Sequence, residues 1–69
     1  MDAADIEKRF TYHPPKDGQS DIYVMIRDAA KQFAYLIDFQ AVDSREKSLA
    51  ITAIEEAVFW ANAAIARNN

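Results

Sequence analysis

The sequence of 69 residues contains no cysteine, one histidine, one glycine and two prolines. Without cysteine there is no disulfide, and His13 alone cannot supply the ligands of a structural zinc site. No apolar run approaches the roughly 18 residues of a membrane span. The first five residues contain two aspartates and lack the basic region of a secretory signal. We therefore expect a soluble cytoplasmic protein that needs no metal or cofactor and binds no membrane.

An excess of positive charge is also missing. Eight Lys or Arg residues stand against eleven Asp or Glu residues, and the net charge is -3. Long DNA or RNA is held mainly by neutralising phosphates over a basic surface, so this balance argues against such partners. A small phosphate ligand needs only a few well-placed cations and is not excluded.

The chain is short for a stable monomer. A domain of this size buries only about 60% of the surface that its unfolded chain exposes, and it is marginal without further support. Apolar residues make up 51% and charged residues 28%, which is a globular balance. With disulfides and metals excluded, assembly into a homo-oligomer is the remaining source of stability.

Helical patterns cover most of the sequence and predict one all-α domain over residues 1–69. A short N-terminal helix is expected over about 2–10, and two longer helices over about 20–39 and 44–67 form an antiparallel hairpin. Ser20 and Ser44 are the expected N-caps of the two long helices. Pro14, Pro15 and Gly18 predict a rigid extended loop before the hairpin.

The third helix carries two apolar faces. One stripe recurs at spacings of three and four residues, as expected for contact with a neighbouring helix. A second line consists of alanines, which allow another backbone to approach closely. One face can pack on the second helix of the same chain. The simplest partner for the second face is another copy of the protein. The predicted oligomer interface consists of Ile51, Ile54, Ala57, Val58, Phe59, Trp60, Ala61 and Ile65.

Two groups of residues are candidates for binding a ligand. In the loop, Tyr12 offers a flat face for a nucleobase, although from the residues alone the simpler interpretation is that it packs the loop on the helices. On the second helix, Arg27 and Lys31 share one face. Either they bind a phosphate, or they only decorate a solvated face, where Lys31 can form weak ion pairs with Asp28 and Asp38.

No catalytic constellation is evident. Glu55 and Glu56 are adjacent, so they point about 100° apart on a helix and cannot act as a paired acid and base within one chain. Charges that rim an oligomer interface are the simpler interpretation. The sequence therefore predicts a protein that is not an enzyme.

Three segments together resemble small phage-encoded proteins that defeat cyclic-oligonucleotide-based antiphage signalling, the anti-CBASS sponges. These segments are RFTYHPP (residues 9–15), SREKSLA (44–50) and EEAVFWANAAIAR (55–67). The resemblance implies three-helix protomers assembled into a hexamer that sequesters cyclic dinucleotides and cyclic trinucleotides without cleaving them. It also implies immune evasion in the cytoplasm of the host cell as the biological role.

The resemblance also suggests roles for individual residues. For cyclic dinucleotides it implies base stacking by Tyr12 and a phosphate contact from a cation of the second helix. Arg27 is favoured over Lys31 because its planar guanidinium suits phosphate oxygens. For cyclic trinucleotides it implies Arg67. The predicted dinucleotide site comprises Tyr12, His13, Pro14, Lys16, Arg27 and Lys31.

Two other functions remain open. The chain could be a helical adaptor that inhibits a host protein, with Phe59 and Trp60 as interface anchors. It could also hydrolyse small nucleotides, which the missing catalytic groups disfavour.

Overall fold

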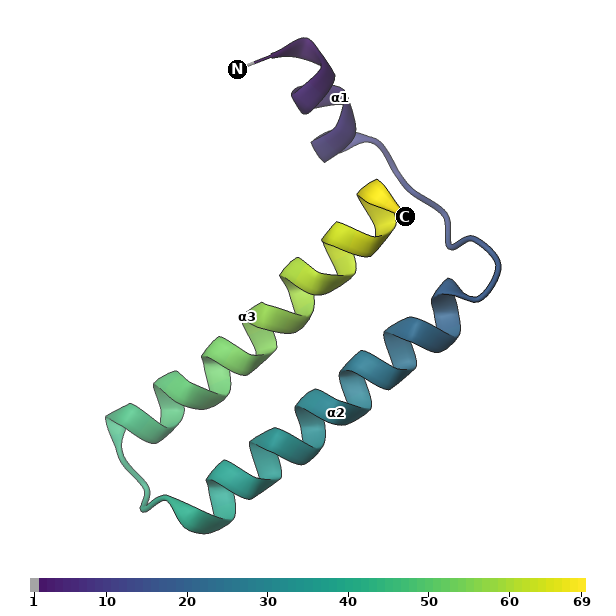
Figure 1. Cartoon of the computed structure of the whole chain (residues 1–69). Helices are drawn as coiled ribbons and strands as arrows, with labels where there is room; N and C mark the ends of the chain where they lie inside the picture. The colour runs from purple at the N-terminus through teal and green to yellow at the C-terminus, as the bar shows by residue number, and fades with distance from the viewer. Residues whose placement is uncertain (1) are drawn as a thin grey trace.

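The computed structural model describes residues 2–69, and within them the chain forms three helices and no strand (Figure 1). Helix α1 spans Ala3–Phe10, α2 spans Gln19–Gln40 and α3 spans Arg45–Asn68. The prediction of an all-α fold is confirmed. Helices α2 and α3 lie side by side as a hairpin, and α1 lies beyond the C-terminal end of α3.

The hairpin forms where local capping and apolar spacing agree. Ser44 caps α3 as predicted, because its Oγ accepts a hydrogen bond of 3.1 Å from the Lys47 backbone N–H. The apolar stripe of α3 is half-buried against α2 at Ile51, Ile54 and Val58. The contact with α2 therefore covers part of the apolar surface of this stripe.

The start of α2 differs from the expected cap at Ser20. Gly18 is the N-cap, with φ 81° and ψ -12°, and Ser20 lies inside the helix. These angles are those of the third residue of a type II turn, and a hydrogen bond of 3.0 Å from the Gln19 N–H to the Lys16 carbonyl oxygen closes the turn. A positive φ favours glycine, so this turn defines where α2 begins.

The described protomer is a single layer of helices. Its extents are 45 × 30 × 12 Å, and the shortest of them is about one helix diameter. The radius of gyration is 15.2 Å, whereas a compact domain of this length has about 11 Å. No apolar side chain within residues 2–69 is fully buried. The hairpin by itself has no hydrophobic core.

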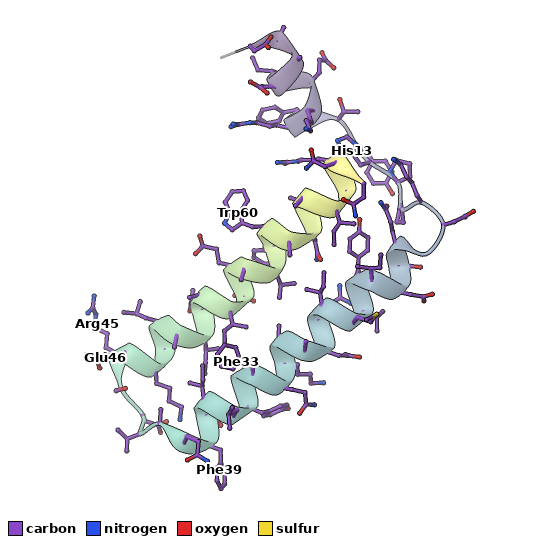
Figure 2. The ribbon with its side chains drawn as sticks, in the orientation of Figure 1. His13, Phe33, Phe39, Arg45, Glu46 and Trp60 are labelled. Carbon is purple, nitrogen blue, oxygen red and sulfur yellow. The ribbon has the colours of Figure 1, made fainter. Side chains whose placement is uncertain are left out.

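One face of this layer is an open apolar groove of about 620 Å³. Helix α2 contributes Ile26, Phe33 and Ile37, and the alanine line of α3 forms the opposite wall. Phe33 points toward α3 yet remains 53% exposed (Figure 2). The alanine line thus lies beside the contact with α2 and stays open.

Among the described helices, α3 alone is long and apolar enough, by length and composition, to cross a membrane. The sequence analysis expected no such span. Glu55 and Glu56 lie in the middle of α3, where a bilayer would penalise charge. Its apolar composition is accounted for by the stripe on α2 and the alanine line.

Lys47 joins the two helices at the turn of the hairpin. Its Nζ donates to the Asp38 carbonyl oxygen at 2.9 Å and lies 2.9 Å from Asp38 Oδ1 and 2.8 Å from Asp43 Oδ1. The hydrogen bond from Lys47 lowers the pKa of Asp43, and the bonds to Asp43 and Asp38 raise the pKa of Lys47. The ammonium group thereby uses its three protons to hold the connection closed.

We expect Lys47→Met to lower the melting temperature, because three acceptors lose their donor. Since the pKa of Asp43 is lowered in the folded state, its contribution is present above the unfolded value of about 4 and is lost as the pH falls further. The difference in melting temperature from the wild type should therefore shrink below about pH 4. Lys8→Met, at an exposed position of α1, is the matched control and should melt like the wild type at every pH.

Candidate functional site

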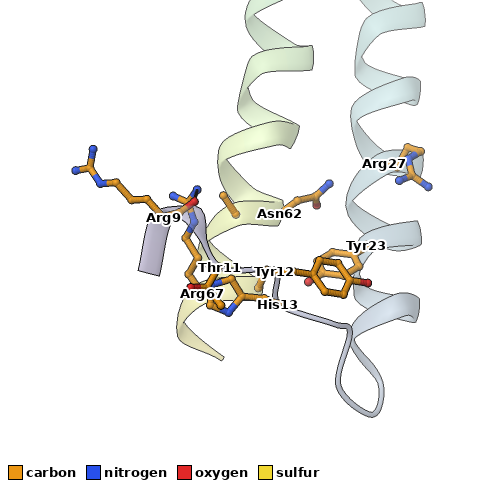
Figure 3. Close-up of a pocket in the computed structure, with 10 residues that line it drawn as sticks. Arg9, Thr11, Tyr12, His13, Tyr23, Arg27, Asn62 and Arg67 are labelled. Atoms are coloured by element: carbon orange, nitrogen blue, oxygen red, sulfur yellow. Dashed lines mark hydrogen bonds between the residues drawn. The ribbon is translucent and has the colours of Figure 1, made fainter. Parts of the chain in front are cut away.

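A cavity of about 390 Å³ lies where the C-terminal part of α3, the first half of α2 and the loop after α1 meet (Figure 3). It is formed by side chains from all three helices and from the loop. The lining residues are Arg9, Thr11, Tyr12, His13, Tyr23, Arg27, Asn62, Ala63, Ala66 and Arg67. Four predicted site residues, from distant parts of the sequence, meet here.

The loop that carries Tyr12 is anchored at the end of α3. Lys16 Nζ donates a hydrogen bond of 2.6 Å to the Asn69 carbonyl oxygen. This bond satisfies a carbonyl at the C-terminus of α3, where a cation is also favoured by the helix dipole. Lys16 does not line the cavity, and neither does Pro14. Lys16 and Pro14 instead belong to the loop segment that supports Tyr12.

Gln19 is the most buried residue in the described part of the chain, with 5% exposure. Its Oε1 accepts a hydrogen bond of 2.9 Å from the Lys16 backbone N–H, and its Nε2 donates bonds of 3.4 Å to the Ile65 and Asn69 carbonyl oxygens. One side chain thus connects the loop, the start of α2 and the end of α3. Sequence patterns do not reveal this role of Gln19, because its partners on α3 lie 46 and 50 positions away.

Two tyrosine rings line the cavity, Tyr12 from the loop and Tyr23 from α2 (Figure 3). Tyr12 is 81% exposed, so it does not simply pack the loop onto the helices. Tyr23 is half-buried. The sequence analysis did not include Tyr23 in the site, although its spacing of four residues from Arg27 placed both on one helix face.

His13 and Arg67 close the cavity beside α1. His13 Nε2 donates a hydrogen bond of 2.9 Å to the Lys8 carbonyl oxygen, which requires the proton on that nitrogen. Arg67 Nη2 donates a bond of 3.4 Å to the Arg9 carbonyl oxygen. The Arg67 bond joins the end of α1 to the end of α3, and the His13 bond joins the loop to the end of α1. Arg67 shares this cavity with Tyr12 in the protomer.

Arg27 stands at the junction of two cavities. It lines the cavity of Tyr12 and also a neighbouring cavity of about 410 Å³, which contains Lys31, Glu55 and Phe59. Lys31 does not reach the first cavity. The suggested ion pairs of Lys31 with Asp28 and Asp38 are absent from the described residues, because Asp38 pairs with Lys47 instead.

The charge in the cavity opposes the charge of the whole chain. Arg9, Arg27 and Arg67 line it and no carboxylate does, although the net charge of the protein is -3. Guanidinium groups bind phosphate oxygens through paired hydrogen bonds, and tyrosine faces stack on bases. Aromatic rings beside a cluster of arginines suit a small ligand that carries both bases and phosphates.

The family model for the Acb2/Tad1 hairpin domain matches residues 2–66. The chain belongs to the Acb2/Tad1 hairpin-domain family, the anti-CBASS sponges. The match runs from the start of α1 nearly to the end of α3, and it includes the Tyr12 loop. Comparisons with curated proteins and with solved structures gave no match.

Membership of the Acb2/Tad1 family supports an anti-CBASS role in binding cyclic oligonucleotides. The family is known for binding its ligands as a sponge rather than for catalysis. Within the part of the chain that the structure describes, no group of three or more His, Asp or Glu side chains is placed to hold a metal ion.

The residues expected at an oligomer interface of this Acb2/Tad1 chain divide into two sets. Five are half-buried against α2, and three are exposed. The half-buried set is Ile51, Ile54, Val58, Ala61 and Ile65, and the exposed set is Ala57, Phe59 and Trp60. Trp60 points away from α2 (Figure 2), and its Nε1 donates a bond of 3.3 Å to Glu56 Oε1. The exposed set is accessible to another molecule, and so are the parts of Ile54, Val58 and Ala61 that line the open apolar groove.

We expect Gln19→Ala to lower the free energy of unfolding by about 1 to 3 kcal/mol, because the Lys16 N–H loses its partner in a nearly buried position. The Lys16 amide should also exchange its hydrogen faster. Chemical unfolding at equal protein concentration and amide exchange measure the two effects.

Ser20→Ala is the control for this prediction. Ser20 is exposed inside α2, so its replacement should change stability by less than about 0.5 kcal/mol. A loss near 1 kcal/mol, as for a removed N-cap, would contradict Gly18 as the start of the helix.

Proposed function

We propose that this chain sequesters cyclic dinucleotides and cyclic trinucleotides intact and thereby inhibits CBASS signalling in the cytoplasm of the host cell. The observation that carries the proposal is the cavity in which tyrosines and arginines gather without a carboxylate. In it, Tyr12 stacks on a base and Arg27 binds a phosphate. His13 supports the loop, and Lys31 lies along the same helix for a second phosphate contact.

The energies favour a site that is completed by more than one protomer. Stacking a base on one ring contributes about 1 to 3 kcal/mol, and a charged hydrogen bond about 1.5 to 3 kcal/mol. One Tyr12 and one Arg27 therefore supply only about 3 to 6 kcal/mol, which association costs can consume. Nanomolar sequestration requires about 12 kcal/mol. A two-fold axis would present the same residues twice to a cyclic dinucleotide, which has two phosphates.

The assembly we propose is a homohexamer. Its support is the single-layer shape of the protomer and the open groove along Ala50, Ala53 and Ala57. In such an assembly, copies of Arg67 converge on the phosphates of a cyclic trinucleotide. Residues without charge or hydrogen-bonding groups dominate the groove, so another apolar helix face suits it best.

A helical adaptor is the second candidate function. Phe59 and Trp60 are 63% and 65% exposed, and large aromatic residues often anchor protein interfaces. An adaptor would act through these side chains and would not need Tyr12. Family membership favours the sponge.

Calorimetric titration with a cyclic dinucleotide tests the sponge. We expect tight binding, and ligand recovered after denaturation should be intact. In the proposed two-fold site, Tyr12→Ala removes the stacking of two bases, about 2 to 6 kcal/mol, and should weaken binding by about 30-fold or more. Arg27→Gln should weaken it to a similar extent through the lost phosphate contact.

Phe39→Ala and Arg45→Gln are the matched controls for this titration. Both side chains lie at the far end of the hairpin from the cavity (Figure 2), and both variants should bind like the wild type. Absence of binding, or recovery of cleaved ligand, would contradict sequestration. Inhibition of CBASS that survives Tyr12→Ala would instead favour the adaptor.

We expect Ala57→Leu to lower the oligomeric state measured by light scattering. Ala57 lines the apolar groove, and the larger side chain would overpack a close helix contact there. Gln32→Leu, at an exposed position of α2 that lines none of the cavities described, controls for added apolar surface. An unchanged mass for Ala57→Leu would mean that the alanine line does not face another protomer.

A further inference from the structure

Asn62 lines the cavity of Tyr12 from the side of α3, and its side chain projects toward α2 (Figure 3). Its Oδ1 is buried and has no hydrogen-bond partner within residues 2–69. A buried acceptor without a donor is costly, and such groups are uncommon in folded proteins. This oxygen therefore needs a donor that the described part of the protomer does not supply.

The other polar groups of the cavity do not duplicate the chemistry of Asn62. Arg9, Arg27 and Arg67 carry donors only, and they suit phosphate oxygens. Tyr12 offers a ring face, which stacks on any base alike. A carboxamide carries an acceptor and a donor side by side, and the edges of nucleobases present the complementary pair. Asn62 is the one carboxamide among the described residues of this lining, since Thr11 has a single hydroxyl and His13 Nε2 already donates to Lys8.

We propose that Asn62 reads the edge of the base that stacks in this cavity and so determines base specificity. The inference rests on the proposed binding of cyclic oligonucleotides. The terminal torsion of asparagine is broad, so a partial rotation about its Cβ–Cγ bond presents both Oδ1 and Nδ2 to a ligand at little cost. The exocyclic amine or ring N–H of a base then donates to this oxygen, and Nδ2 donates to an acceptor on the same edge.

Replacing the carboxamide of Asn62 by the carboxylate of aspartate should change which base is preferred. Asn62 can pair with adenine, through its amine and a ring nitrogen, and also with guanine, through N1–H and O6. Aspartate carries two acceptors and no donor. It pairs well with N1–H and the amine of guanine, whereas it opposes the ring nitrogen of adenine. Asn62→Asp should therefore favour guanine.

The experiment measures the affinities of wild type and Asn62→Asp for cyclic di-AMP and cyclic di-GMP by calorimetry. Each ligand carries the same base twice, so the base in the cavity is known. The added negative charge weakens both ligands alike and cancels in the ratio of their dissociation constants. We expect this ratio to move toward cyclic di-GMP by about tenfold or more.

Gln32→Glu, at an exposed position, adds the same charge outside the cavity and should leave the ratio unchanged. Asn62→Ser has only a short hydroxyl and should bind both ligands several-fold more weakly. Circular dichroism verifies helix content for every variant. If Asn62→Asp does not fold, Asn62→Ser decides, and unchanged affinity in that variant overturns the proposal.

The same titrations separate this proposal from the proposed function. A wild-type protein that binds neither these ligands nor cyclic trinucleotides contradicts the sponge itself. A wild type that binds, together with an Asn62→Asp ratio within twofold of the wild-type ratio, overturns only the role of Asn62.

Discussion

The contact between α2 and α3 is the interaction on which the rest of this protein depends. Ile51, Ile54 and Val58 form a stripe on α3 that packs against α2. Two helices side by side make a layer that is only one helix thick. Such a layer has two faces and no interior, so its other apolar residues remain open. This open apolar surface is the reason why we propose that the chain acts in an assembly.

The cavity depends on the same layer. The hairpin positions Tyr23, Arg27 and Arg67 on two rigid helices, and the loop brings Tyr12 to them. Gln19 and Lys16 hold the loop by bonds to the end of α3 rather than by apolar packing. An acidic chain can therefore present a cationic cavity, because the carboxylates lie elsewhere on the layer.

Local patterns made part of this structure predictable. The helical spacing of α3 and its cap at Ser44 depend on residues within a few positions of one another, and both expectations agree with the structure. Predictions from short sequence spacings failed where two residues could fill the same structural role. Ser20 has the chemistry of an N-cap, but the turn at Gly18 starts α2 earlier. Lys31 lies near Asp38 in sequence, but Lys47 reaches it across the hairpin.

The sequence by itself determined the helices, the apolar stripe on α3 and the family, because each is encoded by residue types at short spacings or by ordered motifs. Only the tertiary structure decided that Tyr12, Arg27 and Arg67 line one cavity, that Gln19 anchors it and that Asn62 is left without a donor. Those relationships join residues tens of positions apart. They follow from how the hairpin folds back on itself, which fixes distances that no local spacing encodes.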